Sequence, residues 1–130
     1  MNKRRMFYHL ARVLSILILG QTLYFKFTGA SESIFIFSTL GMEPWGRYVL
    51  AGFETFTILM LLIPRLVWLG AIIGLNLMFG AILSHFVFLG IIVQNDNGLL
   101  FFLATCVFLF TLYLFYHDRK EVPILKNYFE

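Results

Sequence analysis

One carboxylate stands in the middle of a strongly apolar stretch of the chain. Glu54 is the only acidic residue in residues 45–64, WGRYVLAGFETFTILMLLIP. An ionised carboxylate is costly in hydrocarbon, so such a residue normally faces the interior of a helix bundle or a water-filled cavity and has a partner. The sequence therefore predicts a polar site around Glu54.

Three further ionisable side chains are expected near Glu54. Lys26 closes the first apolar run, Arg47 opens the helix of Glu54, and His85 lies near the end of the third run. Together they form a candidate polar pocket. In one interpretation, Glu54 and His85 exchange protons while Lys26 or Arg47 holds an anionic or carbonyl group. In the other, a buried ion pair only fixes helix register. Both interpretations stay open.

No recognisable cofactor or catalytic motif accompanies these residues. His85 has no second ligand at metal spacing, so no metal site is predicted, and His9 and His117 are expected at the other end, which disfavours a bis-His haem. Cys106 is the single cysteine, too few for an internal disulfide or a redox pair. There is no phosphate loop, dinucleotide fingerprint or nucleophile motif. Whether the chain is an enzyme stays open.

The composition is that of an integral membrane protein. Of 130 residues, 60% are hydrophobic and 13% are charged, against about 25% charged in soluble domains. The net charge is +3, but the cations stand beside the ends of apolar runs, which orients membrane helices and argues against nucleic acid. Residues 1–130 are expected to form one domain. The expected partners are the lipid bilayer, other membrane or redox proteins, and further copies of the chain.

Hydrophobic runs predict an all-α, four-helix membrane bundle. The expected helices are about 8–26, 45–63, 66–89 and 99–117, each close to the roughly 20 residues that cross a bilayer. A cleaved signal peptide fits the first run less well than a retained helix does. Residues 27–44 are rich in turn formers and are expected to form a loop or a short interfacial helix.

Spacing within two helices indicates their inward faces. In the first, Arg12, Ser15, Leu19, Thr22 and Lys26 share a face, although Arg12 and Lys26 could instead extend their heads to the interfaces. In the third, small residues favour close helix packing, which predicts a central position. These small residues are Gly70, Gly74, Gly80 and Ala81.

The distribution of cations predicts the orientation. Most of them flank the N-terminus, the 64–65 turn and the C-terminal tail: Lys3, Arg4, Arg5, Arg65, Arg119, Lys120 and Lys126. The opposite side has Lys26 and Arg47. The positive-inside rule therefore places both termini in the cytoplasm.

A set of short motifs occurs in a fixed order from the first expected helix to the third. The stretches are Gly20 to Lys26, Leu40-Gly41, Tyr48 to Glu54, Ile63-Pro64-Arg65, Gly70-Ala71, Met78, Gly80-Ala81 and His85. Together they resemble the DoxX family of small bacterial four-helix membrane proteins. The resemblance covers roughly residues 10–90 and carries over Lys26, Glu54 and His85. The chain departs from the family in following Glu54 with Thr-Phe-Thr, where members often have glycines.

The resemblance implies a protein of the bacterial inner (plasma) membrane that works with oxidoreductases. Family members are described as subunits of membrane systems such as a thiosulfate:quinone oxidoreductase. The implied function is an accessory subunit of a quinone-linked or oxidative-stress system, with quinone as the implied ligand. The alternative is a non-enzymatic interaction or assembly protein.

Overall fold

The structure, a computed structural model, describes residues 3–43, 45–91 and 98–118. Over these residues the chain folds into helices and turns without a strand, which confirms the all-α prediction. The elements are α1 (Lys3–Thr28), α2 (Ser31–Thr39), α3 (Trp45–Leu62), the 3-10 turn η1 (Pro64–Leu66), α4 (Val67–Ser84), the π-helical turn η2 (His85–Leu89) and α5 (Leu99–His117).

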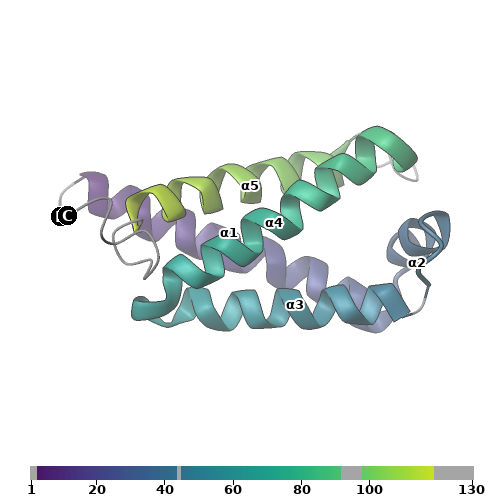
Figure 1. The fold of residues 1–130 in the computed structure, drawn as a ribbon, viewed down its shortest axis with the longest axis horizontal. Helices are drawn as coiled ribbons and strands as arrows, with labels where there is room; N and C mark the ends of the chain where they lie inside the picture. The colour runs from purple at the N-terminus through teal and green to yellow at the C-terminus, as the bar shows by residue number, and fades with distance from the viewer. Residues whose placement is uncertain (1–2, 44, 92–97, 119–130) are drawn as a thin grey trace.

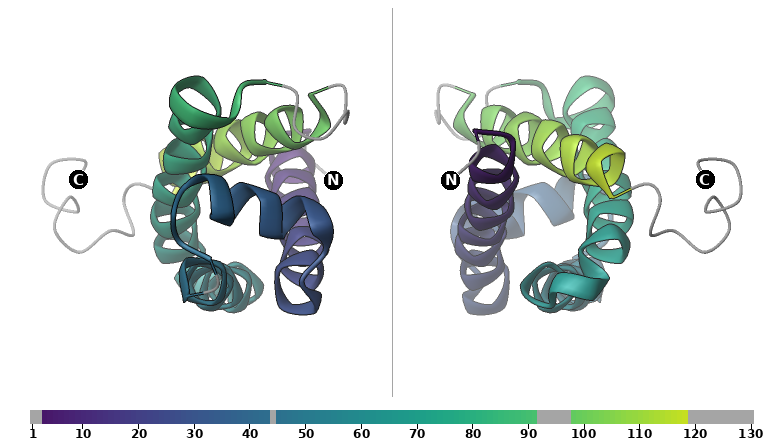
Figure 2. Two further views of the ribbon diagram at one scale, coloured as in Figure 1. Left: turned by 90° about the vertical axis from the view of Figure 1, so that its right-hand side faces the viewer. Right: turned by 90° about the vertical axis from the view of Figure 1, so that its left-hand side faces the viewer.

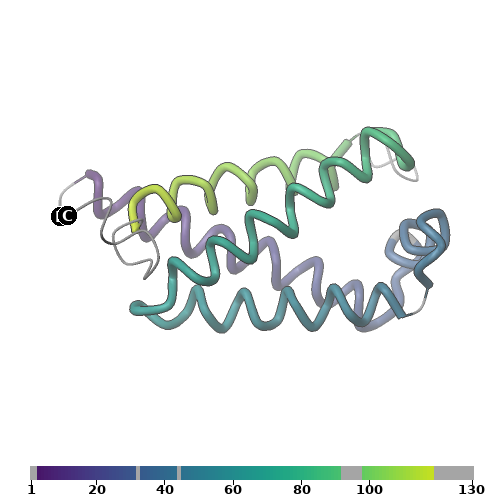
Figure 3. Tube along the Cα trace, viewed as in Figure 1, coloured from purple at the N-terminus to yellow at the C-terminus, as the bar shows by residue number. Residues whose placement is uncertain are grey.

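The four long helices pack side by side as a ring, with α4 between α3 and α5 and with α1 closing the ring against α3 and α5. Figure 1 shows this bundle from the side, and the tube in Figure 3 makes the course of each helix easier to follow. The short α2 lies across one end of the bundle, as the left view of Figure 2 shows. We call this the α2 end and the opposite one the η1 end.

The η1 end gathers the start of α1, the turn between α3 and α4, and the end of α5 (Figure 1). The Tyr8 hydroxyl donates to Asp118 at 2.7 Å and joins α1 to the end of α5. The Arg12 guanidinium donates to the carbonyls of Leu61 and Leu62. These carbonyls end α3, where the last turn of a helix leaves acceptors without intrahelical partners. Arg12 thus points to a neighbouring helix end.

The observed helix limits differ from the expected ones in two places. α1 begins at Lys3 rather than near residue 8, because the Lys-Arg-Arg-Met start consists of good helix formers. The third expected helix is divided into η1, α4 and η2, and it ends at Gly90 with a positive φ of 77°. Residues 27–44 contain the short helix α2, which is one of the two forms expected there. Residues 92–97 and the cations at 119–126 lie outside the described residues.

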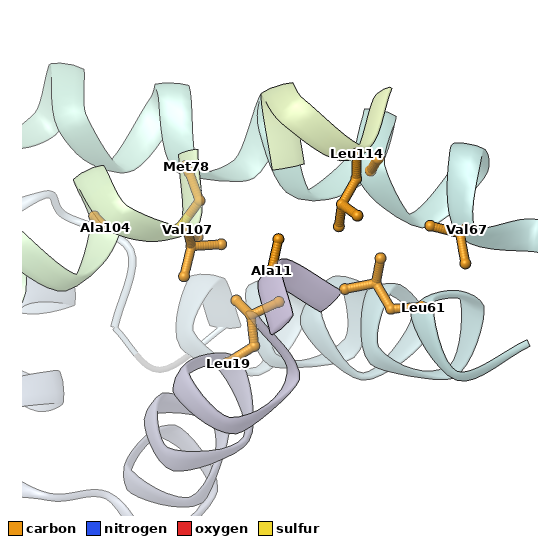
Figure 4. Packing of buried hydrophobic residues seen from close by; sticks show 9 residues of the cluster. Ala11, Leu19, Leu61, Val67, Met78, Ala104, Val107 and Leu114 are labelled. Atoms are coloured by element: carbon orange, nitrogen blue, oxygen red, sulfur yellow. The ribbon is translucent and has the colours of Figure 1, made fainter. Parts of the chain in front are cut away.

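A compact apolar core fills the bundle between α1, α3, α4 and α5 (Figure 4). Leu61, Val67, Val107 and Leu114 are fully buried. The remaining core residues are Ala11, Leu19, Ala71, Met78 and Ala104. The core holds the four helices together at the η1 end and in the middle of the bundle.

Glycines let α4 approach its neighbours near η1. A Cβ atom added to Gly70 would lie 3.0 Å from the Met60 Cβ atom, and one added to Gly74 would lie 3.1 Å from a Thr111 methyl carbon and 3.3 Å from a Thr57 methyl carbon. Gly80 differs, because it is exposed and an added Cβ would meet nothing within 4 Å. The structure therefore does not bring Gly80 into a helix contact.

Three stretches of the described chain are long and apolar enough to cross a membrane. They are α1, the continuous stretch Pro64–Leu89, and α5. α3 is not among them: its 18 residues include Arg47 and Glu54, which lower its hydropathy. The helix that carries Glu54 is thus the one long helix of the described chain that is not apolar enough to count as a candidate span.

We expect Gly74→Leu to destabilise the bundle by about 1–3 kcal/mol, because a larger side chain must displace the buried Thr57 and Thr111. Gly52→Leu is the matched control, since Gly52 is exposed on α3 and an added Cβ meets nothing within 4 Å. Thermal unfolding in mild detergent measures both. Equal midpoints for the two variants would contradict close packing at Gly74.

Candidate functional site

The centre of the candidate site is an ion pair between α1 and α3. Lys26 Nζ lies 2.9 Å from Glu54 Oε1, and the two side chains are only 15% and 6% exposed. The Thr22 hydroxyl lies 3.4 Å from Glu54 Oε2, one helical turn before Lys26. The shared face that the sequence indicates on α1 thus points Thr22 and Lys26 at Glu54. The carboxylate has a charged partner and a hydroxyl beside it.

Arg47 does not join this pair. Its Nε and Nη2 atoms donate to the Glu43 carboxylate at 3.0 and 2.9 Å, and Nη1 donates to the Lys26 carbonyl oxygen. The guanidinium is buried over the C-terminal end of α1, next to Gly29. A helix C-terminus attracts cations because its last carbonyls are unpaired. Arg47 therefore holds α1 and the start of α3 together at the α2 end.

His85 is buried at the start of η2, and its ring is held in one orientation. Nδ1 lies 2.9 Å from the Gly90 carbonyl oxygen, and the Gly90 amide donates to the His85 carbonyl at 2.7 Å. The ring also packs edge-on against Phe101, with 5.5 Å between centroids. Because a carbonyl only accepts, Nδ1 must carry a hydrogen, and Nε2 is the acceptor in the neutral ring.

Lys26, Glu54 and His85 line one cavity of about 350 Å³ in the α2 half of the bundle. α1, α2, α3, α4, η2 and α5 all contribute to its wall. The polar lining residues are Thr22, Lys26, Ser33, Glu54, Asn76, Ser84 and His85. The rest of the lining is mainly aliphatic and aromatic. Its volume is that of a small-molecule site, and an apolar wall with a few convergent polar groups suits an amphiphilic ligand.

α2 closes the end of this cavity, a role that the sequence interpretation missed. Ser33 and Phe37 are buried, and together with Ile36 they line the cavity. Ser33 and Phe37 are four residues apart and so lie on one helix face, while Ile34 and Phe35 are exposed. This spacing was the available signal in a segment too short to span a membrane.

The Thr-Phe-Thr sequence after Glu54 does not narrow the cavity. Thr55, Phe56 and Thr57 are absent from its described lining. Thr57 instead faces Gly74 in the contact between α3 and α4. The residues that depart from the DoxX pattern therefore do not occupy the cavity beside the Glu54 carboxylate, and one of them, Thr57, packs α3 against α4.

The site has few ligands for a metal ion. Within the described residues, no three His, Cys, Asp or Glu side chains lie close enough together to hold one. The chemistry available is that of an ammonium, a carboxylate, an imidazole and several hydroxyl groups facing an apolar space.

Comparison with known proteins returns no match: no family model, curated protein or solved structure matches this chain. The DoxX resemblance consequently stays an expectation from short motifs, and the site must be interpreted from its own geometry.

We expect Lys26→Ala to destabilise the bundle by about 3–5 kcal/mol, because it leaves the Glu54 carboxylate buried without its counter-ion. The double variant Lys26→Met with Glu54→Leu should cost less than Lys26→Ala alone, since it leaves no unpaired charge. Lys3→Ala, at the exposed start of α1, is the control. Thermal unfolding in detergent compares the stabilities of the three variants. A double variant less stable than Lys26→Ala would contradict the prediction.

Proposed function

We propose that the chain is a DoxX-like, four-helix subunit of the bacterial plasma membrane that binds a quinone for a membrane oxidoreductase system. The observation that carries the proposal is the Lys26–Glu54 ion pair on the wall of an apolar cavity that His85 also lines. Such a cavity offers an apolar surface to a ring and its tail, and the Lys26 ammonium to a carbonyl oxygen.

The exposed surface of the bundle supports a position within the bilayer. Large apolar side chains point outward on several helices, among them Leu17 on α1, Phe86 in η2 and Phe102 on α5, each more than 60% exposed. Exposed apolar side chains on several helices suit a surface that faces lipid, since large exposed apolar surfaces mark membrane or interaction sites. Arg4, Arg5 and Arg65 are exposed at the η1 end, which supports the orientation with that end in the cytoplasm.

The polar groups of the cavity suit the two needs of quinone chemistry. The Lys26 ammonium donates hydrogen bonds and so can hold a carbonyl oxygen. Reduction of a quinone consumes two electrons and two protons, and Glu54 and His85 are the groups in the cavity that take up and release protons. The sequence has no electron-carrier motif, so the electrons come from a partner protein in this proposal.

We expect Glu54→Gln to weaken quinone binding by about tenfold to a hundredfold, because it removes the carboxylate that positions the Lys26 ammonium, and this is the loss typical of a hydrogen bond to a charged group. The matched control is Glu43→Gln: this carboxylate pairs with Arg47 and is absent from the described cavity lining. Titration of the purified protein with decylbenzoquinone, followed by native mass spectrometry, measures the affinities. Unchanged binding in the folded Glu54→Gln variant would contradict the proposal.

The second candidate function is a membrane interaction or assembly protein in which the ion pair only sets helix register. The observation in its favour is that Lys26 and Glu54 already pair with each other across α1 and α3. Buried pairs of this kind add little stability but can specify an arrangement.

A charge exchange separates the two candidates. The double variant Lys26→Glu with Glu54→Lys keeps an ion pair between α1 and α3 but reverses the charges that face the cavity. If the pair only fixes register, the exchange should restore the stability lost in Lys26→Ala. The exchanged protein should then also co-purify with the same membrane proteins as the unmodified protein. If the pair binds a ligand, the exchanged protein should fold and yet lose quinone binding.

A further inference from the structure

The cavity is open to the side of the bundle, along one stripe of α4. Asn76 and Gly80 both line the cavity and are exposed, and Ser84 continues the stripe one turn later. These three residues are spaced by four and so follow one another along one helix face. The cavity therefore reaches the outer surface of the bundle beside Gly80.

The opening follows from the way α3 and α4 separate from each other. Near η1 the two helices are in close contact, with Gly70 against Met60 and Gly74 against Thr57. Towards the α2 end they diverge, as Figures 1 and 3 show. In that half no atom of a neighbouring element lies within 4 Å of the position where a Gly80 Cβ would be. We call the resulting opening the α3–α4 slot, lined by Leu50, Asn76, Gly80 and Ser84.

The surroundings of the slot are apolar. Phe79 and Leu83 flank it on α4, and both side chains are about half exposed. In a bundle that lies in the bilayer, the slot faces lipid chains and not water. An opening with an apolar rim and a charged interior matches a molecule with a polar head and a hydrocarbon tail.

We propose that the α3–α4 slot is the passage for the tail of the bound quinone. The head lies in the cavity near Lys26, Glu54 and His85, and the tail leaves over Gly80 into the lipid. This inference rests on the proposed function and specifies its ligand as a long-tailed, membrane-dissolved quinone. A cavity of about 350 Å³ accommodates a ring with a short length of chain, so most of a long tail must lie outside.

A side chain that fills the slot tests the proposal. Gly80→Phe should weaken binding of decylbenzoquinone by about tenfold to a hundredfold, the usual effect of forcing extra atoms into an occupied space. The tailless parent benzoquinone should bind with unchanged affinity, because its head does not use the slot. Asn76→Phe, one turn earlier along the same stripe, should likewise weaken binding of decylbenzoquinone and leave binding of benzoquinone unchanged. This variant replaces Gly80→Phe if Gly80→Phe does not fold.

Gly52→Phe is the matched control, because Gly52 is exposed on α3, has no neighbour within 4 Å of an added Cβ, and is absent from the described cavity lining. It should bind both quinones as the unmodified protein does. If folded Gly80→Phe and Asn76→Phe keep full affinity for decylbenzoquinone, the slot is not the passage, although the proposed function stands. If both variants lose the tailless quinone equally, the slot shapes the cavity and carries no tail. If the unmodified protein binds neither quinone, the proposed function itself fails and the passage with it.

Discussion

The burial of the Glu54 carboxylate is the constraint on which the rest of the α2 half depends. A charge in an apolar setting needs a partner that reaches it, and Lys26 does so from α1 at 2.9 Å. The pair joins α1 to α3 where both helices line the cavity. It also keeps polar groups at one wall of a space that is otherwise lined by aliphatic and aromatic side chains.

The two neighbours of α3 are joined to it in different ways. α1 is fastened to α3 at both ends: Arg12 donates to the last carbonyls of α3, while Arg47, near its start, donates to the end of α1. α4 is joined to α3 through η1 and the contacts at Gly70 and Gly74. Past those contacts α3 and α4 separate, and the cavity occupies the space between the diverging helices and α2.

The sequence sufficed for the elements and for part of the site. Long apolar runs predicted the all-α fold, and a shared helix face pointed Lys26 towards the bundle interior. The sequence could not decide between Lys26 and Arg47 as the partner of Glu54, because both are long cationic side chains. The choice depends on where the C-terminus of α1 lies in the folded bundle. Gly70 and Gly80 are both small residues of the same expected helix, so the sequence predicts a helix contact for each. Only the angle between α3 and α4 decides that Gly70 contacts α3 and that Gly80 does not. The π-helical turn at His85 has no sequence signature.

The order of the ion pair along the chain has a consequence for biogenesis. The ribosome synthesises α1, with its ammonium group, before α3, with its carboxylate. In a membrane, the charge of Glu54 in the middle of α3 opposes the transfer of this helix from the translocon into lipid. If α1 is already in the membrane when α3 enters, the Lys26 ammonium can pair with the carboxylate and lower this barrier.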